Sequence, residues 1–229
     1  ANAAKRGDEA ALLAWIDSGG NANAFDSAGF TLLMSAADHG HERVVELLLQ
    51  RGAEIDLQNS DCGTAMIYAA GSGKDRVVEL LLQRGAKIIL PGQVTHCCIA
   101  LMSAASSGHE RVVDLLLQRG AEIDLQDSDG STALMLAADE GHERVVELLL
   151  RHGAEIDLRD SKGYTALMNA ASDGHERVVE LLLRHSADVN KQNSNHYPAL
   201  MCAAYNGHSA VVLRLLRAGA DTAPRSESG

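Results

Sequence analysis

The 229-residue sequence is poor in aromatic residues, proline and cysteine, and each scarcity excludes a class of protein. Aromatic residues make up only 3% of the chain, so its 46% of hydrophobic residues must build a core from Leu, Val, Ile, Ala and Met, which favours helices. Three prolines and the lack of a low-complexity run argue against a disordered chain. The four cysteines (62, 97, 98 and 202) lack the spacing of a disulfide framework, which predicts an intracellular protein of the cytoplasm or nucleus.

The chain also has fewer positive than negative residues, and it has no long apolar run. Its 20 Lys and Arg residues against 31 Asp and Glu residues give a formal net charge of −11, which disfavours binding to nucleic acid or to an anionic membrane. No apolar stretch approaches the ~18 residues that span a bilayer, and the first residues contain no apolar signal-peptide segment. We therefore expect no nucleic-acid partner, no membrane insertion and a chain that is monomeric on its own.

A glycine followed by a polar residue, usually His, recurs along the sequence. It occurs at Gly40, Gly73, Gly108, Gly141, Gly174 and Gly207, in steps of 33, 35, 33, 33 and 33 residues. A second glycine follows each of these by twelve residues, except that Ser186 replaces it in one unit. Units of this length that repeat almost verbatim predict a solenoid of stacked supersecondary elements.

Each unit reads as two short helices and a turn. In one unit, Thr132 is predicted to cap a first helix that ends at Gly141, and a second helix covers residues 143–151 and ends at Gly153. Two such helices cannot bury their apolar faces alone, so they must stack on neighbouring pairs. Cys62 and His196 stand at the turn position where other units have glycine, and they are predicted to adopt a positive φ.

The repeated pattern D-x-x-G-x-T-x-L-x-x-A-A-x-x-G-H-x-x-V-V-x-x-L-L-x-x-G-A resembles the ankyrin repeat over nearly the whole chain. The resemblance implies an all-α solenoid of stacked helix-turn-helix units with β-hairpin-like fingers. We expect one domain over residues 1–224, with an N-terminal capping unit (1–24), six repeats (25–57, 58–90, 91–125, 126–158, 159–191 and 192–224) and a disordered tail (225–229). Because Gly7 corresponds to Gly40, the first helix is expected to need residues before Ala1, as in a piece of a longer protein.

Two departures from the family pattern bear on the core and on one finger. Met replaces the usual His of the first helix, which removes the bond of that His to the Thr hydroxyl, and the methionines are expected to pack between repeats. They are Met34, Met102, Met135, Met168 and Met201. The third repeat has a longer, more apolar finger over residues 90–98, either as a binding element or as a tolerated insertion.

The ten histidines and four cysteines do not form a convincing metal motif. His41, His109, His142, His175 and His208 recur once per repeat, too far apart to share a tetrahedral ion, and are expected to tie each loop to the neighbouring backbone. Cys97, Cys98 and His96 could bind zinc with Cys62 of the preceding finger, but there is no C-x-x-C spacing and no fourth ligand in register. We expect no metal and no cofactor.

No catalytic motif occurs in the chain. Acidic pairs such as Asp139 and Glu140 are expected at solvent-facing helix ends, without a pocket that would shift a pKa. These observations predict a non-catalytic protein.

In the family that this sequence resembles, partners bind the concave face, which consists of the finger tips and the exposed end of each first helix. Carried over to this chain, that face predicts binding through residues at which the repeats differ from one another. They are Phe30, Asp38, His39, Tyr68, His96, Cys98, Asp139, Glu140, Tyr164, Asn169, Asp173, Asn195, Tyr197, Tyr205 and Asn206.

The chemistry of this set predicts the type of partner. Tyrosines concentrate in the last two repeats, the middle repeats are acidic, and most arginines belong to the second helices. We therefore expect a protein or peptide partner with basic and apolar character. Two alternatives are a structural spacer or scaffold segment of a larger protein without a specific ligand on that face, and an engineered repeat scaffold, against which the irregular third repeat argues.

Overall fold

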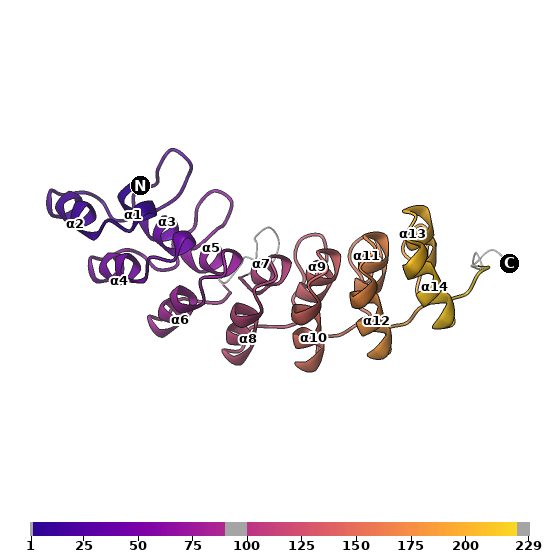
Figure 1. Ribbon diagram of the computed structural model, residues 1–229. Helices are drawn as coiled ribbons and strands as arrows, with labels where there is room; N and C mark the ends of the chain where they lie inside the picture. Colours follow the sequence, from indigo (N-terminus) through magenta and orange to yellow (C-terminus); the bar gives the residue numbers. More distant parts are fainter. Residues whose placement is uncertain (1, 90–99, 224–229) are drawn as a thin grey trace. The chain divides into compact units, whose positions relative to one another are not determined.

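The computed structural model describes residues 2–89 and 100–223, which fold as helices without a β-strand (Figure 1). The chain divides into two compact units, Ala1–Ala121 and Glu122–Gly229. In the first unit the helices are α1 (Asn2–Arg6), α2 (Glu9–Asp17), α3 (Leu32–His39), α4 (Glu42–Gln50), α5 (Ala65–Gly71), α6 (Asp75–Gln83), α7 (Ala100–Ser106) and α8 (Glu110–Gln118). In the second they are α9 (Ala133–Asp139), α10 (Glu143–Arg151), α11 (Ala166–Ser172), α12 (Glu176–Arg184), α13 (Ala199–Tyr205) and α14 (Ser209–Arg217).

Within each unit the helices form two layers. The odd-numbered helices pack on one another, as in α3 against α1 and α5, and the even-numbered helices do the same, as in α12 against α10 and α14 (Figure 1). Each odd-numbered helix also packs against the even-numbered helix that follows it. The expectation of an all-α stack of helix pairs is therefore confirmed.

The predicted threonine caps are present and buried. The hydroxyls of Thr31, Thr64, Thr132 and Thr165 each accept a hydrogen bond from a backbone N–H in the first turn, at 3.1–3.4 Å. Such a bond satisfies one of the free donors at a helix start. Pro198 takes this place in α13 and provides no side-chain cap. Proline also has no backbone N–H of its own that would need an acceptor.

The core lies between the layers and between successive pairs. Val145, Val146 and Leu149 of α10 are buried, as the helical spacing predicts. Four of the five predicted core methionines are buried, and Met201 is half-buried. In the first repeat, the Met34 sulfur accepts a bond from the Thr31 backbone N–H at 3.4 Å.

The recurring histidines join neighbouring repeats, as expected. The Nε2 atoms of four of these histidines form hydrogen bonds with backbone carbonyls of the preceding repeat or capping unit, at 2.7–2.9 Å. The pairs are His41 with Lys5, His109 with Gly71, His175 with Asp139, and His208 with Ser172. Each bond satisfies a carbonyl at the end of a first helix. The histidines are therefore part of the stacking contact.

The fingers are tight loops that begin at an Asp or Asn side chain. Asp160 accepts from the backbone N–H groups of Lys162 and Tyr164, and its own N–H donates to the Tyr164 carbonyl. Cys62 and His196 have φ values of 58° and 63°, which confirms the predicted left-handed turn positions. The irregular finger (90–98), with His96, Cys97 and Cys98, and the tail (225–229) lie outside the described residues.

Candidate functional site

The finger tips and the C-terminal ends of the first helices form the surface that the sequence singles out, here called the recognition surface. In the second unit its fingers are joined edge to edge. The Ser161 N–H donates to the Asp129 carbonyl at 2.8 Å, and the Ser194 N–H donates to the Lys162 carbonyl at 2.9 Å. The fingers of the fourth, fifth and sixth repeats therefore form one continuous, hydrogen-bonded edge.

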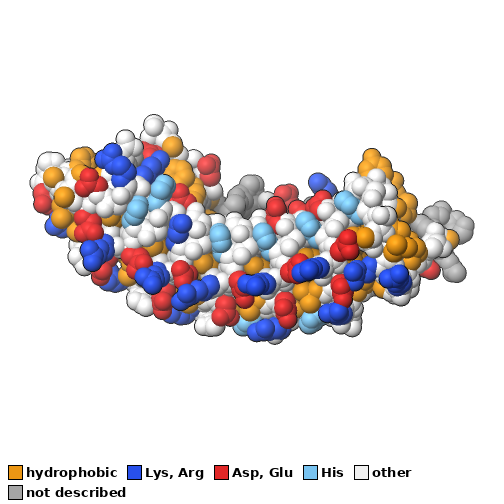
Figure 2. Space-filling view, viewed as in Figure 1, with side chains coloured by type: hydrophobic (Ala, Val, Ile, Leu, Met, Phe, Trp, Pro, Cys, Tyr) orange, Lys and Arg blue, Asp and Glu red, His pale blue; other side chains and the backbone are white. Residues whose placement is uncertain are grey.

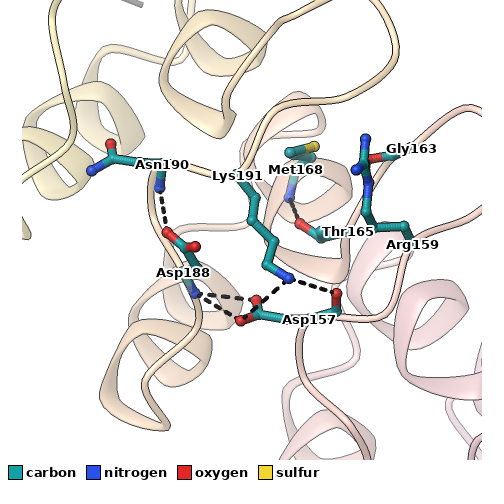
Figure 3. A network of polar contacts seen from close by, with 8 residues as sticks. All are labelled: Asp157, Arg159, Gly163, Thr165, Met168, Asp188, Asn190 and Lys191. Carbon is teal, nitrogen blue, oxygen red and sulfur yellow. Dashed lines mark hydrogen bonds and ion pairs between the residues drawn. The ribbon is translucent and has the colours of Figure 1, made fainter.

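Cationic side chains near these fingers bind the chain itself (Figure 3). Arg159 donates to the carbonyls of Gly163 and Gln192, at 3.3 and 2.8 Å. Lys191 donates to the Asp157 carbonyl at 3.3 Å and lies 4.0 Å from its carboxylate. These two cations hold the bases of neighbouring fingers together, and Lys191 also lies beside a carboxylate.

The ends of the first helices are linked by side chains 34 residues apart. Ser72 donates to Asp38 at 2.5 Å, and Asn206 donates to Ser172 at 3.0 Å. Each of these contacts joins a hydrogen-bond donor to an acceptor across the boundary between two repeats.

Asp139 and Asp173 are also 34 residues apart and occupy the positions that correspond to Asp38 and Ser72. Here, however, both side chains are carboxylic acids. Burial, the negative charge of Asp173 and a hydrogen bond between the two side chains together raise the pKa of Asp139 to about 6, with burial as the largest cause. The prediction that this helix end has no environment able to shift a pKa was wrong. The physical reason is the stacked neighbour, which removes water from Asp139 and places a second carboxylate beside it.

The aromatic side chains of the recognition surface fall into two groups. Phe30 and Tyr68 pack on each other with ring centroids 4.5 Å apart, and Tyr68 accepts a bond from Asn59 at 2.8 Å. Tyr197 and Tyr205, by contrast, are 44% and 89% exposed. The first pair therefore stabilises the first unit, and the tyrosines of the sixth repeat offer free contact area.

The predicted partner-binding residues differ in accessibility. His39, Glu140, Asp173, Asn195, Tyr197, Tyr205 and Asn206 are exposed. Phe30, Asp38, Tyr68, Asp139, Tyr164 and Asn169 are half-buried. His96 and Cys98 lie outside the described residues.

Sequence reasoning missed two groups of residues, one in the fingers and one on the last second helix. Asn59 and Asn193 are buried and hold their finger turns, as Asp160 does in the fifth repeat. Their position at the start of the turn was the available signal. Leu213 and Leu216 of α14 are exposed by 54% and 38%, and the signal for Leu213 was that the other repeats carry Glu or Asp at its position.

The second helices carry a ladder of ion pairs on the opposite layer. Arg84 pairs with Glu46, Arg111 with Asp75, and Arg214 with Glu176 and Glu180. Figure 2 shows basic and acidic side chains intermixed over the even-numbered helices. Exposed pairs of this kind contribute about 0–1 kcal/mol each, but they neutralise the layer on which most arginines lie.

Within the part of the chain that the structure describes, no group of three or more His, Cys, Asp or Glu side chains is placed to hold a metal ion. Over the same residues, no helix is both long enough and apolar enough to cross a membrane.

A sequence model of ankyrin repeats matches three segments of the chain, residues 1–91, 87–160 and 152–226. The chain belongs to the ankyrin-repeat family. Its fold is similar to the crystal structure of the human ASB11 ankyrin repeat domain, with a TM-score of 0.86 and 28% identity over 97% of this chain and 98% of that chain. No significant match is found among curated proteins. Ankyrin-repeat domains are generally protein–protein interaction modules and usually non-catalytic, so this domain implies protein partners.

Proposed function

We propose that this domain is a non-catalytic, intracellular recognition module that binds a basic and apolar segment of a partner protein on the recognition surface. The observation that carries the proposal is the pair of exposed tyrosines, Tyr197 and Tyr205, on the same repeat stack as the exposed acids Glu140 and Asp173. Tyrosine provides a large contact area with a polar tip at low entropic cost, and it is enriched among residues that dominate binding energy.

The distribution of charge supports a basic partner. Glu140 and Asp173 are exposed at the first-helix ends of the fourth and fifth repeats. Arg159 and Lys191, at the bases of these fingers, already bind backbone carbonyls of the chain, whereas Lys162 is exposed at the tip of the fifth finger. A negative surface steers a cationic segment and accelerates its association, and the tyrosines then slow its dissociation once they are desolvated.

The chemistry of the partner can be tested with random peptides displayed on phage and selected on the whole chain. We expect selected peptides to be enriched in Lys or Arg together with apolar residues. In kinetic measurements on one such peptide, Tyr197→Ala should mainly accelerate dissociation, at a cost of about 2 kcal/mol in binding free energy. Glu140→Lys with Asp173→Lys should slow association and flatten its dependence on salt.

A matched double variant controls for net charge. Glu147→Lys with Glu155→Lys makes the same charge change at exposed positions on α10 and in the loop after it. It should leave both rate constants nearly unchanged. If it weakened binding as much as the recognition-surface variant, or if selection gave no basic peptides, the proposal would be wrong. The domain would then fit better a spacer or scaffold segment.

A further inference from the structure

We draw no further inference here: the strongest candidate, the cluster of the Asp139, Glu140 and Asp173 carboxylates at the first-helix ends of the second unit, belongs to the recognition surface already described, and among the described residues no other group shows which ligand it would hold.

Discussion

At the scale of single residues, folding changes the protonation of Asp139. Its pKa of about 6 lies above its ordinary value of 3.8 because of burial and then because of Asp173. A raised pKa means that the folded state binds the proton more tightly than the unfolded state does. The contribution of this pair to stability is therefore greatest below about pH 4 and is lost as the pH rises through about 6.

This linkage predicts a pH effect that one substitution removes. Asp173→Ser would reproduce the Asp38–Ser72 contact, in which a hydroxyl donates to the carboxylate. We expect it to raise the free energy of unfolding at about pH 7 by on the order of 1 kcal/mol, after allowance for screening by solvent, and by less at about pH 5. Urea denaturation at both values measures this. Equal gains at the two pH values would show that the carboxylates do not interact.

At the scale of elements, contacts between fingers restrict the turn glycines more than φ alone does. Gly130 and Gly153 both have positive φ, 78° and 90°. A Cβ on Gly130 would lie 2.9 Å from the Ser161 nitrogen, which bonds the adjacent Asp129 carbonyl, whereas a Cβ on Gly153 would meet nothing within 4 Å. The two positions therefore separate backbone strain from steric exclusion.

We predict that Gly130→Ala destabilises the protein more than Gly153→Ala, by about 1–2 kcal/mol, because only the first also displaces the neighbouring finger. Chemical denaturation gives the two free energies. Amide exchange at Ser161 should accelerate in Gly130→Ala alone. Equal destabilisation by the two substitutions would mean that the neighbouring finger can move away at no cost in free energy.

The elements themselves could be predicted well from the sequence. The second helix expected at 143–151 is α10, and the first begins after its predicted cap, Thr132. These features depend on local patterns of caps, glycines and apolar spacing. The pKa of Asp139 and the internal pairing of Phe30 with Tyr68 depend on contacts between residues more than 30 positions apart, so no local pattern reveals them.

At the scale of the whole molecule, stability in such a stack is close to a sum of repeat terms and nearest-neighbour terms. Within the second unit, α12 packs against both α10 and α14, whereas among the described helices α14 packs only on α12 and α13. We predict faster amide exchange in α14 than in α12, by about tenfold, which corresponds to about 1.4 kcal/mol of local stability. Mass spectrometry on the native protein measures both helices at once. Equal protection would mean that the unit unfolds as a whole.

The histidine bonds also bear on how such a chain can change in length. His41, His175 and His208 each reach a carbonyl 36 residues earlier, whereas His109 reaches one 38 residues earlier, across the repeat with two extra residues. The partner of His109 is still the end of the preceding first helix, so the additional residues are absorbed without shifting the contact. A gene for this protein can therefore gain codons within a finger and still encode the same junction between repeats.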